Sequence, residues 1–164
     1  MGDDGAGVRL IEKLDSVMQD RFDLIDCGTD LLRLATVDYP YETIFIVDAL
    51  VSGETPGSIH WYRPDHIKSF RQSDSVHQLA ALEAVFLLPM MNEFISESNL
   101  FLVGIEPACL SLIPELSEPV RTALSWLTTE FTQVSSVGLL RERCEQKTCT
   151  PVADFLIGYP EGAE

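Results

Sequence analysis

Two mainly apolar runs constrain the fold of this chain more than any other feature of its sequence. One is TIFIVDALV over residues 43–51, and the other is NLFLVGIEP over residues 99–107. Apolar runs without alternation are typical of strands that are covered on both faces in a parallel sheet. Both runs are too short to span a bilayer. A sheet covered on both faces needs helices in two outer layers, so the pattern predicts a three-layer α/β domain.

Helical patterns flank these runs. Apolar side chains at helical spacing predict one helix after Gly5, a second near Val76 and a third that follows Ser117, a residue type that favours helix N-caps. Residues 29–36 (TDLLRLAT) predict a short helix. These helices supply the two outer layers.

Two shorter segments complete the sheet that we expect. Residues 22–27 (FDLIDC) predict a strand that ends at Gly28, and residues 58–63 (SIHWYR) predict another strand after the turn residues SGETPG. We expect residues 58–63 to pair with residues 44–51 as antiparallel neighbours.

The length of 164 residues suits one domain with a sizeable core. The periodicity weakens near residue 135. We therefore expect one α/β domain over residues 1–134 and a partly disordered tail over residues 135–164.

The composition excludes several partners and compartments. A formal net charge of −15 argues against nucleic acid, because few basic residues are present to neutralise phosphates. The N-terminus has no basic and apolar signal pattern, so we expect a cytoplasmic protein without a membrane partner. The four cysteines are scattered, so we expect reduced thiols rather than disulfides or a zinc site.

Several standard sites are missing from the sequence. It has no His-Glu-x-x-His zinc motif, no Gly-x-Ser-x-Gly elbow and no Walker A loop. The turn GDDGAG has the wrong glycine spacing for a dinucleotide loop. Its two carboxylates would also repel a pyrophosphate at the helix N-terminus.

The remaining candidates for chemistry are carboxylates. Asp3 and Asp4 lie between Gly2 and Gly5, and helix capping explains one acid there but not two. Glycines on both sides also let the backbone approach another group closely, so capping and function are about equally plausible for this pair. Asp48 interrupts an apolar run, where burial of an unpaired charge costs several kcal/mol. Because the carboxyl ends of strands in α/β sheets are where ligands bind, we favour a functional role for Asp48.

His77 lies at the start of a predicted helix and is compatible with a ligand, a base or a helix cap. Two acids and a histidine that converge on one edge of a sheet suit a divalent metal ion. They also suit acid–base chemistry. The spacing alone does not decide between metal binding and acid–base catalysis.

Five motifs in a fixed order give the chain a family resemblance: GDDGAGVRLIEKL, DCGTDLL, IFIVDALVSGETPGSI, HQLAALEAV and LVGIEP followed by LSEPVRTAL. This set resembles the hydrogenase maturation proteases, endopeptidases that process the large subunit of nickel–iron hydrogenases. The match runs from Met1 to about Leu127. The resemblance implies an α/β/α fold with a mixed, mainly parallel sheet, which has five strands in the family.

The resemblance also implies an activity. These proteases remove a C-terminal extension from the large-subunit precursor after nickel has been inserted. By motif, Asp4, Asp48 and His77 would be the nickel ligands, and Asp4 or Asp48 would assist hydrolysis. The nickel would be that of the precursor, used for recognition, and not a resident cofactor. The partner would be the precursor itself, and we expect the protease to be a monomer.

The chain departs from the family at its start. The family begins with a β-strand that ends in a Gly-Asn pair, and that strand lies between the second and third strands of the sheet. Without it the sheet would have a central gap and two unpaired edges. Either the start has been placed at an internal methionine, which we favour, or the product is a real truncation.

Two other functions stay open. One is a catalytically inert relative that binds a nickel-loaded partner without cutting it. The other is an unrelated divalent-metal hydrolase that uses the same acids and holds its metal without a partner.

Overall fold

The structure is a computed structural model that describes residues 2–18, 22–66, 76–110 and 115–133. For residues 16–18, 66 and 76–80 it describes the backbone alone. The tail expected over residues 135–164 lies outside these ranges.

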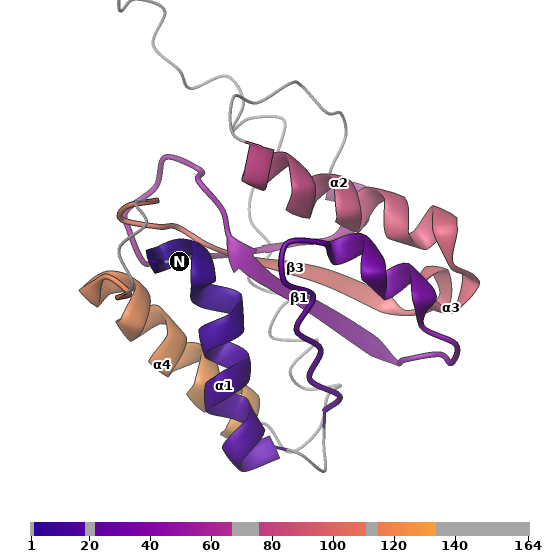
Figure 1. The fold of residues 1–164 in the computed structure, drawn as a ribbon, viewed down its shortest axis with the longest axis horizontal. Helices are drawn as coiled ribbons and strands as arrows, with labels where there is room; N and C mark the ends of the chain where they lie inside the picture. The colour runs from indigo at the N-terminus through magenta and orange to yellow at the C-terminus, as the bar shows by residue number, and fades with distance from the viewer. Residues whose placement is uncertain (1, 19–21, 67–75, 111–114, 134–164) are drawn as a thin grey trace, which may run out of the picture.

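The described residues form helices and three strands (Figure 1). In chain order they are the 3-10 helix η1 (Gly2–Gly5), α1 (Ala6–Met18), the 3-10 helix η2 (Leu31–Thr36), β1 (Thr43–Ala49), β2 (Ile59–Tyr62), the 3-10 helix η3 (Pro64–His66), α2 (Val76–Met91), α3 (Glu93–Glu97), β3 (Asn99–Ile105) and α4 (Glu118–Gln133). The two apolar runs form β1 and β3, as the sequence predicts. The three main helices begin close to the predicted positions.

The sheet of the described residues has the strand order β1-β3-β2. β1 pairs with β3 in parallel, with Asp48 opposite Gly104, and β2 pairs with β3 antiparallel, with His60 opposite the same glycine. The predicted antiparallel pairing of residues 44–51 with residues 58–63 is therefore wrong. β3 lies between them, and this central position buries all of its residues except the first.

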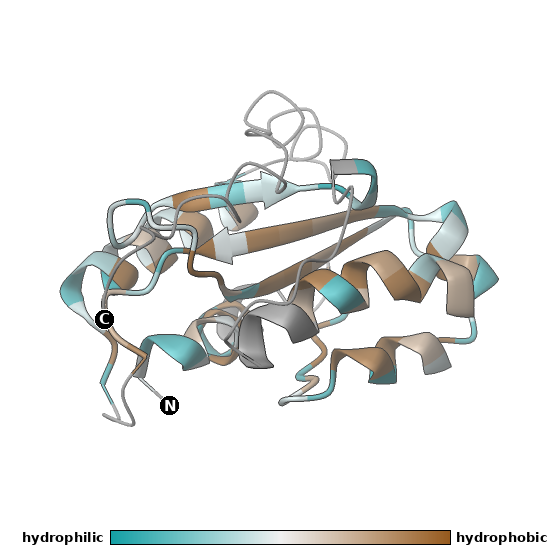
Figure 2. Ribbon diagram, turned by 90° about the horizontal axis from the view of Figure 1, so that it is seen from above, coloured by the Kyte–Doolittle hydropathy of each residue, from teal (hydrophilic) through white to brown (hydrophobic). Residues whose placement is uncertain are grey.

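Helices cover both faces of the sheet, which confirms the three-layer α/β fold. α1 and α4 pack together on one face, and α2, α3 and η2 cover the other (Figure 1). Figure 2 shows hydrophobic residues along the strands in the middle of the molecule.

Successive residues of β3 enter alternate cores, as the pleat of a strand requires. Phe101 and Val103 pack in the core beneath α1 and α4, which also contains Leu124 and Leu127 of α4. Leu102 packs in the core beneath α2. Each fully buried side chain of this kind contributes about 1.5–3 kcal/mol relative to an exposed one.

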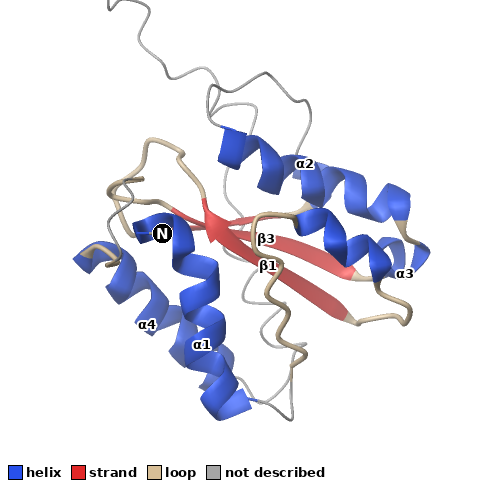
Figure 3. Ribbon diagram, in the orientation of Figure 1, coloured by secondary structure: helices blue, strands red, loops and turns tan. Residues whose placement is uncertain are grey.

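Residues 22–27 are not a strand, so this prediction is wrong (Figure 3). Their apolar side chains still pack: Phe22 and Leu24 contact the core beneath α1 and α4, and Cys27 belongs to the core beneath α2. Within the described residues, however, this segment forms no ladder with β1, which is at the edge of the sheet. A strand-like sequence needs a neighbouring strand to satisfy its backbone groups, and no described strand supplies one here.

Candidate functional site

A groove of about 480 Å³ lies along the edge of β1 that pairs with none of the described strands. Its walls are α1, residues 22–28 and residues 41–48, and this volume is in the usual range for ligand sites. Asp4 and Asp48 both line the groove, so the structure brings the two predicted site carboxylates to one cavity.

Asp4 reaches the groove because α1 begins directly against the carboxyl end of β1 (Figure 1). The approach is so close that a Cβ added at Gly7 would lie 2.3 Å from the carbonyl oxygen of Val47. Only glycine permits this contact. Gly7 therefore places the turn that carries Asp4 next to the residue that precedes Asp48.

Asp48 lies near the end of β1 and is half-buried. Its Oδ1 accepts a hydrogen bond of 2.8 Å from the backbone N–H of Ala49, which fixes one oxygen of the carboxylate. The neighbouring position on β3 is Gly104, and Leu50 packs over it so tightly that a Cβ there would lie 2.8 Å from the Leu50 side chain. The backbone around Asp48 is thus held by close packing on both sides of the ladder.

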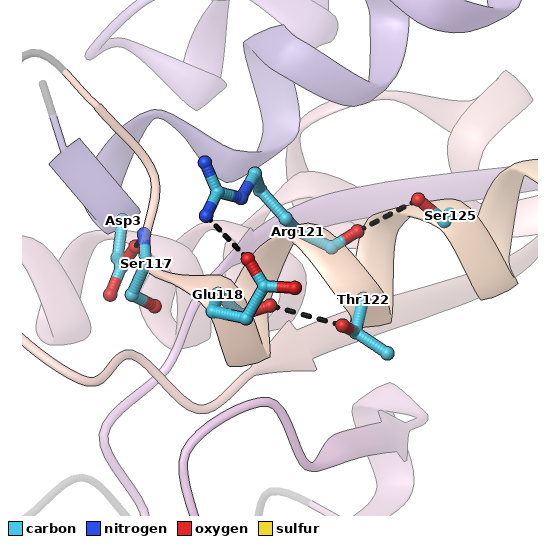
Figure 4. Close-up of polar contacts among 6 residues, drawn as sticks. All are labelled: Asp3, Ser117, Glu118, Arg121, Thr122 and Ser125. Atoms are coloured by element: carbon cyan, nitrogen blue, oxygen red, sulfur yellow. Dashed lines mark hydrogen bonds and ion pairs between the residues drawn. The ribbon is translucent and has the colours of Figure 1, made fainter.

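Asp3, the neighbour of Asp4, has a structural role (Figure 4). It is 2% exposed, and its carboxylate accepts hydrogen bonds from the backbone N–H groups of Ala108 (2.9 Å), Cys109 (3.2 Å) and Ser117 (2.7 Å). Burial alone would raise the pKa of Asp3, but the hydrogen bonds from Ser117, Ala108 and Cys109 outweigh it and hold this pKa below its usual value. Asp3 therefore ties the N-terminal turn to the start of α4 and does not cap its own helix.

His77 lies in the first turn of α2, which confirms its predicted place at the start of a helix. The structure describes its backbone and not its side chain. Among the side chains that are described, no three His, Cys, Asp or Glu residues are grouped so that they could hold a metal ion. Convergence of His77 with Asp4 and Asp48 accordingly stays a prediction.

Sequence reasoning missed a second buried carboxylate at this end of the sheet. Glu106, directly after β3, is 4% exposed, and its Oε2 accepts hydrogen bonds from the N–H (2.7 Å) and the hydroxyl (2.5 Å) of Ser52. The Ser52 hydroxyl oxygen lies 3.4 Å from Nε2 of His60, which is itself buried. The signal was an acid at the end of the apolar run over residues 99–107, the same kind of signal that marks Asp48.

The two carboxylates of the groove can act in two ways. Paired carboxylate oxygens are suitable ligands for a divalent cation, and one carboxylate can also take a proton from an attacking water.

A helix long and apolar enough to cross a membrane is not present in the described part of the chain.

The sequence is similar to a family of known proteases and to several of its relatives. Residues 8–133 match the HycI family of hydrogenase maturation proteases. The protein FrxA of Pyrococcus furiosus is 32% identical over 126 residues, an alignment that covers 76% of this chain and 89% of FrxA. The hydrogenase expression/formation protein HupD of Thiocapsa roseopersicina is 28% identical over 85% of this chain and 66% of HupD. The chain belongs to the hydrogenase maturation protease family.

Solved structures show the same fold. The hydrogenase maturation protease HybD of Thermococcus kodakarensis superposes with a TM-score of 0.64 at 25% identity, over 83% of this chain and 92% of HybD. The hydrogenase maturating endopeptidase HybD of Escherichia coli has a TM-score of 0.64 at 24% identity, over 94% of this chain and 92% of that protein. The family resemblance stated from the motifs is therefore confirmed.

Proposed function

We propose that the protein is an endopeptidase that removes the C-terminal extension of a nickel–iron hydrogenase large-subunit precursor after nickel insertion. One observation carries this proposal: Asp4 and Asp48 come from separate elements and line one groove in a member of the hydrogenase maturation protease family. The partner is the precursor, and the protease acts on it as a cytoplasmic monomer.

The nickel ion belongs to the substrate. Asp4, Asp48 and His77 bind the nickel of a correctly loaded precursor and so position the peptide bond that follows. A carboxylate and an imidazole are ordinary ligands for such an ion. Asp4 or Asp48 then takes the proton from the water that attacks the scissile carbonyl.

The direct test is cleavage of a nickel-loaded precursor by the full chain, measured as loss of the C-terminal peptide by mass spectrometry. Asp48→Ala and His77→Ala should leave the precursor uncleaved, because each removes a ligand from the nickel. Asp38→Ala is the matched control, since Asp38 is exposed and does not line the groove. Circular dichroism of each variant checks that the fold is intact. Full processing by Asp48→Ala or His77→Ala would disprove the assignment.

The cleavage assay and elemental analysis together separate the proposed protease from the inert relative and from the unrelated metal hydrolase. An inert relative would bind the nickel-loaded precursor and leave its mass unchanged. An unrelated metal hydrolase would contain a divalent metal after purification without any partner, which elemental analysis detects. The proposed function requires cleavage by a protein that carries no stoichiometric metal of its own.

A further inference from the structure

The half-buried side chain of Ser52 joins all three strands of the described sheet at one end. Ser52 lies shortly after the end of β1, and its hydroxyl donates to Oε2 of Glu106, which directly follows β3. The same hydroxyl oxygen lies 3.4 Å from Nε2 of His60 in β2. Asp48 and His60 both pair with Gly104 of β3. These contacts therefore lie at the end of the sheet that carries Asp48.

Glu106 is held in place by bonds that do not involve Ser52. Its N–H donates to the carbonyl of Ser58 at 2.9 Å, and its carbonyl accepts from the N–H of Gly57 at 2.8 Å. These bonds extend the pairing of β2 with β3 beyond the pair of Ile59 and Ile105. If the contact between Glu106 and Ser52 is weakened, the segment that carries Ser52 is therefore the part that moves.

The contact between Ser52 and Glu106 consists of two short hydrogen bonds to one oxygen. Oε2 of Glu106 accepts from the hydroxyl of Ser52 at 2.5 Å and from its N–H at 2.7 Å. Hydrogen bonds to a charged acceptor are about twice as strong as those between neutral groups. Because one bond comes from the backbone and the other from the side chain, the pair fixes both the place and the rotamer of Ser52.

The segment between Asp48 and Ser52 connects this contact to the groove. Oδ1 of Asp48 accepts from the N–H of Ala49 at 2.8 Å, so the orientation of the carboxylate depends on the backbone at residue 49. The next residue, Leu50, donates its N–H to the carbonyl of Ile105 at 3.0 Å and packs over Gly104. Ser52 is the next point at which this backbone is bonded to the end of β3. A shift at Ser52 therefore reaches Ala49 through a segment of only a few residues.

We propose that Ser52 is a positioning residue for Asp48. Its two bonds to Glu106 set the course of residues 49–52, and this course sets the orientation of the Asp48 carboxylate in the groove. The inference rests on the proposed protease function, in which Asp48 contacts the nickel or the attacking water and Ser52 contacts neither. A displacement of about 1 Å, caused far from the chemistry, can lower a rate by up to about a hundredfold, so weaker anchoring of Ser52 should lower kcat.

The test compares Ser52→Ala with Ser98→Ala in the full chain. Ser52→Ala removes the hydroxyl and keeps the N–H that donates to Glu106. Ser98 is the matched control, because it is also half-buried and its hydroxyl donates to the carbonyls of Tyr41 and Phe94, each at 2.7 Å. It directly precedes β3 and so lies at the opposite end of the sheet from Asp48. Both variants should have a slightly lower thermal midpoint, so stability alone does not separate them.

Steady-state cleavage of the nickel-loaded precursor gives the first measurement. Ser52→Ala should have a kcat roughly tenfold below that of the wild type and a KM within about twofold of it. Ser52→Thr keeps a hydroxyl and should restore most of kcat. Ser98→Ala should keep the kcat and the KM of the wild type.

Amide hydrogen exchange gives a second measurement that needs no substrate. The amide of Ala49 reports the course of residues 49–52, and the amide of Leu102, in the centre of the sheet, reports opening of the whole fold. Ser52→Ala should raise the exchange rate of Ala49 relative to that of Leu102 at least about fivefold. Ser98→Ala should leave the ratio of the two rates unchanged.

The two measurements separate failure of this inference from failure of the proposed function. If the wild type leaves the precursor intact, the proposed function fails, and the exchange ratio still decides whether Ser52 positions residue 49. The inference is overturned if Ser52→Ala keeps the exchange ratio or the kcat of the wild type. It is also overturned if KM rises at constant kcat, which would make Ser52 a substrate contact. An equal loss of kcat in Ser98→Ala would reduce both effects to stability and overturn it as well.

Discussion

Two pairs of carboxylates lie at the carboxyl end of the sheet, and the structure treats them in opposite ways. Asp3 and Glu106 are almost fully buried, and together they accept five hydrogen bonds from N–H and hydroxyl donors. Asp4 and Asp48 are half-buried and line an apolar-walled groove.

The difference separates a structural acid from a candidate site acid more clearly than sequence position does. Asp3 and Asp4 are adjacent, and both lie in η1. A buried carboxylate that accepts several backbone N–H groups joins segments of the fold. A carboxylate that faces a cavity can contact a ligand there. Substitutions in the first pair should therefore change stability, and substitutions in the second pair should change activity.

The largest effect is expected for Gly7→Ala, which changes the positions of Asp4 and Asp48 by moving the backbone that carries Asp4. The new Cβ would lie 2.3 Å from the carbonyl oxygen of Val47, so α1 must move away from β1. We expect a loss of about 3 kcal/mol of unfolding free energy in urea denaturation. Gly53→Ala is the control: it has a positive φ but open space around it, and should cost about 1 kcal/mol. Equal costs for the two variants would contradict the close approach of α1.

The buried and groove carboxylates can be compared directly with Asp3→Asn and Asp4→Asn. Asp3→Asn weakens three charge-assisted hydrogen bonds and should cost about 2 kcal/mol of unfolding free energy at pH 7. Asp4→Asn should cost about 0.5 kcal/mol, the size of a helix-dipole effect. Cleavage should show the reverse order. A larger stability loss for Asp4→Asn would exchange the two assigned roles.

The pH dependence sharpens the role of Asp3. Its pKa in the folded state is below the usual value of about 3.9, so its contribution to stability is present above that value and is lost as the pH falls through the folded pKa. The stability difference between the wild type and Asp3→Asn should therefore shrink below about pH 4. Denaturation curves from pH 7 to pH 2.5 measure this. A difference that stays constant over this range would mean that the charge of Asp3 contributes nothing.

Within the buried pair, Glu106→Gln should have a smaller effect on stability than Asp3→Asn. The glutamine oxygen can still accept from the N–H of Ser52, so the loss is that of charge on one acceptor, about 1 kcal/mol. Glu97→Gln, on the exposed end of α3, should change stability by less than about 0.5 kcal/mol. Thermal denaturation compares the two. Equal stability of both variants would remove Glu106 from the structural pair.

The sequence predicts where the helices and strands of this fold lie in the chain better than it predicts which strands pair with each other. β1, β3 and α4 follow from local apolar patterns, and such patterns depend on residues close together in the chain. The position of β3 between β1 and β2 depends on contacts across about fifty residues, as in the pair Thr43 and Asn99, and local patterns do not contain it. Residues 22–27 failed as a strand for the same reason, because a strand also requires a partner.

The site was predictable in part. Asp48 was marked by its place in an apolar run and Asp4 by its glycine turn, and the structure places both at one groove. The structural role of Asp3 was not decided by sequence, because it lies in hydrogen bonds from residues 108, 109 and 117. Gly7 matters because it lets α1 lie close to the carbonyl oxygen of Val47 in β1. The sequence shows only one more glycine in a glycine-rich turn, so this close contact could not be predicted from it.

The central position of β3 also has a consequence for the time course of folding. β1 and β2 are close in the chain, but each pairs with β3, which follows them by more than thirty residues. No local hairpin between them can form first and nucleate the sheet. During synthesis both strands must wait until residue 105 has left the ribosome, and their apolar side chains remain exposed for that interval. Loop closure over this separation slows folding, so a nascent chain of this protein offers chaperones a longer period of contact than a hairpin-first topology would.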